Sequence, residues 1–237
     1  MTIRVGLALA VLGLGAATLT GCGGGGDSDF EKQSAEDIVG SAKTDMKKLD
    51  SVKVAGTVTS DGQEISLDVQ SGSGGNCTGS ITVGGGTTEL LGVDGQTWMR
   101  PDEAFWRSFG GDSADQILSA VGDKWVVIGA DEDSFNQFCD VDKLLDELLK
   151  DESDDSTYKK LGSDELDGDD VIKVENNDSE DGPSTGYVLV DEPHYLVKVE
   201  RTEGSDQGSV TFSDFDAKFD VEAPADDEVV DLNSLGG

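Results

Sequence analysis

Residues 52–69, VKVAGTVTSDGQEISLDV, carry the pattern that decides the fold. Apolar side chains alternate with other residues in both halves of this stretch, at Val52, Val54 and Val58 and again at Ile65, Leu67 and Val69. Such a period of two is typical of strands with one buried face. Asp61 and Gly62 separate the halves, and this pair favours a two-residue turn. The stretch therefore predicts an antiparallel hairpin.

The pattern extends on both sides of a helical middle. It predicts further strands at residues 81–83, 88–93, 96–100, 124–129, 171–175, 187–191, 195–201, 209–212 and 218–221. Apolar spacing of three and four predicts helices at residues 34–49, 102–110, 113–121 and 134–150. This order of elements predicts an α+β fold, with helices on one face of a curved antiparallel sheet and a single domain over residues 31–237.

The N-terminal segment has the layout of an export signal. Arg4 precedes an apolar run at residues 5–18, which is too short to span a membrane. Residues 19–22, Leu-Thr-Gly-Cys, resemble a bacterial lipobox, which implies cleavage after residue 21 and a diacylglyceryl group on Cys22. An ordinary signal peptide with an incidental cysteine is the alternative. Two acyl chains anchor stably, and residues 22–30 would form a flexible tether at the outer face of the cell membrane.

The charge of the chain narrows its range of partners. Asp and Glu number 50 against 17 Lys and Arg, which gives a formal net charge of −33 at pH 7. Phosphate groups repel such a protein, so nucleic acid is excluded as a partner, and anionic lipid would not adsorb it. A covalent anchor is therefore favoured over electrostatic adsorption. We interpret the excess acid as a solvated surface, with weak calcium binding by acidic loops left open.

The remaining cysteines form an even pair. If Cys22 is lipidated, Cys77 and Cys139 are left in an oxidising compartment, which predicts a disulfide between them. One buried and one reactive thiol is the alternative. The chain has a single histidine, His194, and no C-x-x-C pair, so we expect no metal site and no cofactor.

Two letter patterns for catalytic nucleophiles occur without their structural setting. Residues 182–186 fit G-x-S-x-G but lead into a predicted strand rather than a helix, and residues 156–159 fit S-x-x-K without its companion motifs. His194 follows a turn and is more simply a surface residue. We therefore predict that the protein is not an enzyme.

An aromatic group stands out among the apolar residues: Trp98, Phe105, Trp106 and Phe109. Aromatic side chains bury large areas, so core packing is one interpretation. The other is that they form the wall of an apolar pocket. The two interpretations are compatible in a fold that encloses a cavity.

Several stretches resemble one family of proteins. Residues 35–59, 194–203 and 210–232 are similar to actinobacterial lipoproteins that share a fold with the LolA/LolB carriers and the mycobacterial LprG/LppX group, while residues 77–100 resemble uncharacterised lipoproteins of filamentous actinobacteria. The resemblance implies a half-barrel sheet around helices, with an apolar cavity for lipids or glycolipids. It carries over no catalytic or binding motif.

Together these observations predict a binding protein. We expect a monomeric, membrane-anchored, extracytoplasmic lipoprotein that holds or shuttles a lipid or another apolar ligand in an internal cavity. The alternative is a cell-surface interaction or regulatory lipoprotein without such a cavity. A hollow interior of acyl-chain size would distinguish the two.

Overall fold

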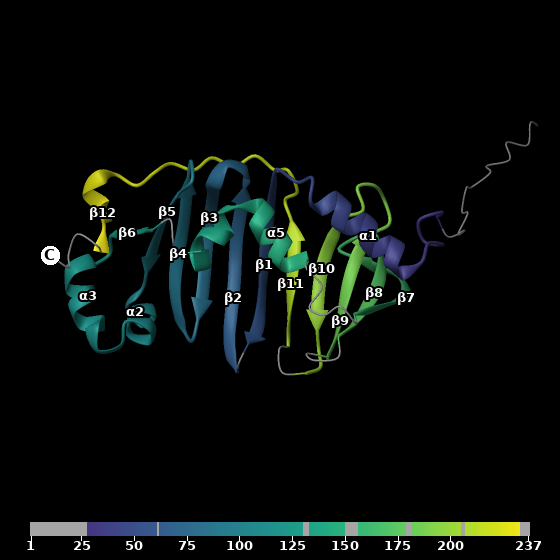
Figure 1. Ribbon diagram of the computed structural model, residues 1–237, viewed down its shortest axis with the longest axis horizontal. Coiled ribbons are helices and arrows are strands. Elements are labelled where there is room, and N and C mark those ends of the chain that lie inside the picture. The colour runs from purple at the N-terminus through teal and green to yellow at the C-terminus, as the bar shows by residue number, and fades with distance from the viewer. Residues whose placement is uncertain are drawn as a thin grey trace, which may run out of the picture.

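The computed structural model describes residues 28–232, apart from residues 61, 130–132, 150–155, 179–181 and 205–206. Cys22 and the predicted export signal lie outside the described residues. The strands form one open twelve-stranded sheet in the order β12-β6-β5-β4-β3-β2-β1-β11-β10-β9-β8-β7 (Figure 1). The sheet curves as a half-barrel, with helices on one of its faces, so the predicted α+β class is confirmed.

The strands form two antiparallel meanders that meet where β1 pairs with β11. The N-terminal meander comprises β1 Ser51–Ser60, β2 Gln63–Gly72, β3 Asn76–Val83, β4 Gly86–Val93, β5 Gln96–Pro101 and β6 Trp125–Ile128. The C-terminal meander comprises β7 Thr157–Leu166, β8 Asp169–Asp178, β9 Gly182–Leu189, β10 Leu196–Arg201 and β11 Gly208–Ser213. A short strand, β12 Val229–Val230, pairs in parallel with β6.

The first hairpin is the one that the sequence predicts. Ser60 pairs with Gln63, which leaves a two-residue turn, and Gly62 adopts a φ of +75° that favours glycine. Gly56 of β1 then brings the two meanders together. A Cβ atom at this position would lie 2.1 Å from the carbonyl oxygen of Ser209 on β11, so only glycine permits this close approach.

Helix α1, Ala35–Met46, lies across the C-terminal meander. It begins where Ser34 Oγ accepts a hydrogen bond of 3.1 Å from the backbone N–H of Asp37. Ile38, Ala42 and Met46 on one helix face are buried in the main core. Helices α2 Glu103–Phe109 and α3 Ala114–Val121 stand at the β6 end of the sheet (Figure 1).

The prediction of one continuous helix at residues 134–150 is wrong. The chain instead forms α4 Asp133–Asn136, a 3₁₀ turn at Gln137–Cys139 and α5 Val141–Leu149. Asp140 leaves the helical region and its carboxylate accepts the N–H of Lys143 at 3.2 Å, which starts a new helix. At this break the buried Cys139 is bonded to Cys77 of β3, with 4.7 Å between their Cα atoms. The predicted disulfide is therefore present.

Two strand predictions also differ from the structure. Strand β7 was not predicted, because it is an edge strand whose side chains are mostly exposed and give no apolar alternation. The strand predicted at residues 218–221 is extended chain without a ladder partner. There Phe219 packs on the backbone of Gly72 at the end of β2, and the C-terminal segment runs across the ends of the strands towards β12 (Figure 1).

Candidate functional site

A partly open cavity of about 290 Å³ lies on the helix-bearing face of the C-terminal meander. Ligand pockets span roughly 300–1,000 Å³, so the cavity is at the small end of that range. Its walls come from two helices and six strands. The lining residues are Val39, Ala42 and Lys43 of α1; Val58 of β1; Leu148 and Leu149 of α5; Tyr158 of β7; Val174 and Asn176 of β8; Ser184, Gly186 and Val188 of β9; Leu196, Val199 and Arg201 of β10; and Gly208, Ser209, Val210 and Phe212 of β11.

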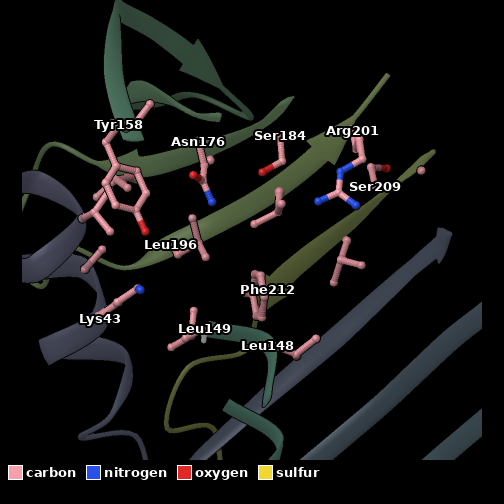
Figure 2. A pocket seen from close by; sticks show the side chains of 18 of the residues that line it. Lys43, Leu148, Leu149, Tyr158, Asn176, Ser184, Leu196, Arg201, Ser209 and Phe212 are labelled. Atoms are coloured by element: carbon pink, nitrogen blue, oxygen red, sulfur yellow. The ribbon is translucent and has the colours of Figure 1, made fainter. Parts of the chain in front are cut away.

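Most of this lining is apolar. Val39 and Ala42 follow the helical spacing that directs them to the sheet, while Leu148 and Leu149 approach from α5. Figure 2 shows Leu149 beside Phe212, whose ring comes from β11. Few polar groups line this part of the cavity. An apolar ligand that binds here would therefore break few hydrogen bonds between the lining and water.

A polar row lies along one side of the cavity. Asn176 and Ser184 are direct partners across β8 and β9, and Arg201 follows on β10. Figure 2 shows these three side chains in a row that Tyr158 continues beside Asn176, while Lys43 lies apart on α1. The cavity is thus amphipathic, with a polar edge and an apolar floor.

The charge of the lining differs from that of the whole protein. The 237-residue chain has 50 acidic residues, yet the described lining residues include Lys43 and Arg201 and no Asp or Glu. The side-chain oxygen Oδ1 of Asn176 is buried without a hydrogen-bond partner. An unsatisfied buried acceptor costs about 1–3 kcal/mol, so this atom favours a ligand that can donate to it.

The other face of the same strands carries a separate polar cluster. Tyr187 Oη and Lys198 Nζ both donate hydrogen bonds to the carboxylate of Glu200. The pKa of Tyr187 is raised to about 12, mainly by burial and secondly by the hydrogen bond to Glu200. The pKa of Glu200 is lowered, mainly by the hydrogen bond from Lys198 and secondly by the one from Tyr187. Side chains of a strand alternate between faces, so this cluster does not belong to the cavity.

The aromatic group named from the sequence lies elsewhere. Phe105 and Trp106 are buried, at 4% and 5% exposure, whereas Phe109 is 54% exposed with its ring 4.5 Å from that of Phe105. Trp98 alternates with the buried Thr97 and Met99 and so belongs to the opposite face of β5. None of the four aromatic residues lines the cavity.

The other candidate residues show no catalytic grouping. The ring of His194 stacks on Phe30 at 3.5 Å, and its Nδ1 atom lies 3.2 Å from the carbonyl oxygen of Leu189. Ser184, the serine of G-x-S-x-G, lies within β9 rather than on a strand-to-helix turn. Across the described ranges, no group of three or more His, Cys, Asp or Glu residues could hold a metal ion. In the same part of the chain, no helix is both long and apolar enough to cross a membrane.

Sequence reasoning missed the residues that line the cavity. One signal was available: Asn176 and Arg201 each stand two residues after a valine in a strand, so each belongs to the buried face that the valines define. A polar residue at such a position indicates a buried polar site.

Comparisons with known proteins agree on the fold. No family model matches the chain, and no curated protein does. The crystal structure of LprF from Mycobacterium bovis is similar, with a TM-score of 0.54, 18% identity and coverage of 81% of this chain and 97% of LprF. The lipoprotein LppX from Mycobacterium tuberculosis has a TM-score of 0.51, 18% identity and coverage of 80% and 100%. The cavity is therefore built on a fold similar to that of LprF and LppX, as the resemblance to the LprG/LppX group implies.

Proposed function

We propose that this protein is a membrane-anchored, extracytoplasmic lipoprotein that holds or carries a lipid in the cavity beneath α1 and α5. The observation that carries the proposal is the apolar cavity itself, which the alternative of a solid interaction module does not require. The lipobox-like residues 19–22 and the likeness to LprF and LppX support it. The resemblance seen in the sequence implies acyl chains as the ligand class.

Binding would require no covalent chemistry. Each methylene group that moves from water into the apolar cavity contributes about 0.8 kcal/mol. A cavity of about 290 Å³ suits one acyl chain better than a bulky lipid with several chains. Because one wall is made by helices and the other by the sheet, a chain would lie between α1 and α5 on one side and β8–β11 on the other.

The first described residues support a position close to the membrane. Lys160 Nζ donates hydrogen bonds to the carbonyl oxygens of Glu31 and Gln33, at 2.6 and 2.9 Å. These bonds hold the start of the fold against β7, which also contributes Tyr158 to the cavity. Six residue steps separate Cys22 from Ser28, and such a chain spans at most about 20 Å. An anchor at Cys22 would therefore keep the cavity near the bilayer.

Lipid extraction tests the proposal. The soluble form of residues 23–237, secreted so that its cysteines oxidise, would be extracted with organic solvent and analysed by mass spectrometry beside the intact protein. We expect a stoichiometric acyl lipid, or uptake of one equivalent of an added fatty acid. Val39→Trp, which fills the cavity, should lower that stoichiometry. Thr44→Trp, an equally bulky change at an exposed position of α1, should not.

Two results would contradict the carrier function. Protein that contains no lipid and takes up none would favour the surface-interaction alternative. Equal lipid content in Val39→Trp, Thr44→Trp and the parent protein would show that any bound lipid lies outside this cavity.

A further inference from the structure

We infer that the cavity selects a single-chain lipid with an anionic head group, which Arg201 attracts and whose hydroxyl or amide group donates to Asn176. This inference rests on the proposed lipid-binding function and specifies its ligand. The shared chemistry of the head group is a phosphate or a carboxylate at the end of one acyl or alkyl chain.

The first argument is the sign of the charge. In a chain with a formal net charge of −33, the polar row of the cavity includes a cation, Arg201, beside Asn176 and Ser184 (Figure 2). A cation lowers the energy of an anion most where water is partly excluded, because the local dielectric constant is low. A guanidinium group can also bind a phosphate or carboxylate through two parallel hydrogen bonds. The protein would repel such a ligand elsewhere on its surface, so the cavity is where it would bind.

The second argument is the acceptor on Asn176. Its buried Oδ1 atom has no hydrogen-bond partner, and the residue borders the cavity next to Ser184. A carboxylate, or a phosphate that has lost both of its protons, has no proton to give to this oxygen. A hydroxyl or amide group next to the anion does, so a head group that carries both matches the polar row better than an anion alone.

The third argument is the arrangement of the two regions. Asn176, Ser184 and Arg201 follow one another across three neighbouring strands, whereas the leucines of α5 and Phe212 lie on the apolar side (Figure 2). A ligand with one polar end and one apolar chain satisfies both regions at once. The head group would lie at the polar row and the chain beneath the helices.

The experiment compares ligands of equal chain length. Binding to delipidated residues 23–237 would be measured by calorimetry at pH 7 for dodecyl phosphate, laurate and the neutral monolauroylglycerol, below their aggregation concentrations. We expect at least about tenfold tighter binding of the better anion than of the neutral lipid. The relative affinities of dodecyl phosphate and laurate would separate a phosphate head group from a carboxylate.

Variants then test the residues. Arg201→Gln should weaken binding of the anions at least about tenfold, change binding of monolauroylglycerol little, and be partly restored by Arg201→Lys. Arg100→Gln removes the same charge outside the cavity and serves as the control. Asn176→Leu should weaken binding of lauroyl lysophosphatidate, which has a hydroxyl group beside its phosphate. The same substitution should leave binding of dodecyl phosphate unchanged.

The outcomes separate the two proposals. Equal affinity for neutral and anionic lipids, or an equal loss in Arg201→Gln and Arg100→Gln, would overturn the anionic preference and leave lipid binding intact. Absence of binding for every lipid in the folded parent protein would overturn the proposed function itself. Weaker binding of both phosphates by Asn176→Leu would overturn the role given to its amide oxygen.

Discussion

At the residue scale, a small polar cluster shows how neighbours set protonation on the outer face of the sheet. Tyr187 shares the carboxylate of Glu200 with Lys198, whose ammonium group lies 5.0 Å from the centre of the Tyr187 ring. The neutral phenol donates to the carboxylate, whereas a phenolate would face it as a second anion. Ionisation of Tyr187 is therefore opposed in the folded protein.

We predict that Tyr187 ionises near pH 12, above its ordinary pKa of 10.0. A folded-state pKa that is raised contributes stability below the unfolded pKa and loses it as pH rises, here between about 10 and 12. The measurement is ultraviolet absorbance of phenolate against pH, with Tyr187→Phe subtracted to isolate the residue. Glu200→Gln should shift the transition to lower pH. A transition of Tyr187 near pH 10 in the folded parent protein would refute the prediction.

At the element scale, helix α1 links the sequence to the cavity. Ser34 fixes its start, its buried face packs on the sheet, and Val39, Ala42 and Lys43 line the cavity. The helix therefore contributes both to the core and to the candidate site. A substitution at its first turn should lower the stability of the whole fold and leave the residues that line the cavity unchanged.

We predict that Ser34→Ala lowers the free energy of unfolding by about 1 kcal/mol, because the N–H of Asp37 loses its acceptor. Urea denaturation followed by circular dichroism would measure the change. Ser34→Asn keeps a capping oxygen and should stay within a few tenths of a kcal/mol of the parent. If both variants are equally destabilised, the capping role assigned to the Ser34 hydroxyl is incorrect.

The same element shows why part of the fold could be predicted from sequence. The apolar spacing of α1 and the alternation in β1 and β2 are local signals, and the elements that they predict are present. The break at Asp140 and the edge strand β7 depend on tertiary partners, the disulfide and the sheet edge, which no local window contains. The cavity was harder still, since its lining joins α1 to strands more than 100 residues later in the chain. The four aromatic residues were chosen as a candidate pocket wall because their side chains are large and apolar. Residue type alone does not show which face of a strand or helix a side chain occupies.

At the scale of the whole molecule, the two meanders have separate features. The disulfide joins β3 to the turn before α5 and closes a loop within the N-terminal half of the sheet. The cavity lies almost wholly on the C-terminal meander. The disulfide and the cavity thus lie in different parts of one sheet.

We predict that replacing both Cys77 and Cys139 by Ala lowers the free energy of unfolding by about 4 kcal/mol, the value for a loop of 62 residues on the chain-entropy model. Lipid stoichiometry of the folded double variant should remain unchanged, because neither cysteine lines the cavity. Urea denaturation and lipid analysis by mass spectrometry would measure the two quantities. Unchanged stability, or loss of lipid from folded protein, would contradict this division.

The ladder between β1 and β11 also determines when the protein can finish folding. Lys53 pairs with Ser213, which lies 213 − 53 = 160 positions later in the chain. Such distant pairing has a high contact order, and it must wait until nearly the whole polypeptide is available. For a chain that crosses a membrane N-terminus first, the early meander would emerge without its final neighbour. The cavity would therefore form only at the end of translocation, when β11 pairs with β1.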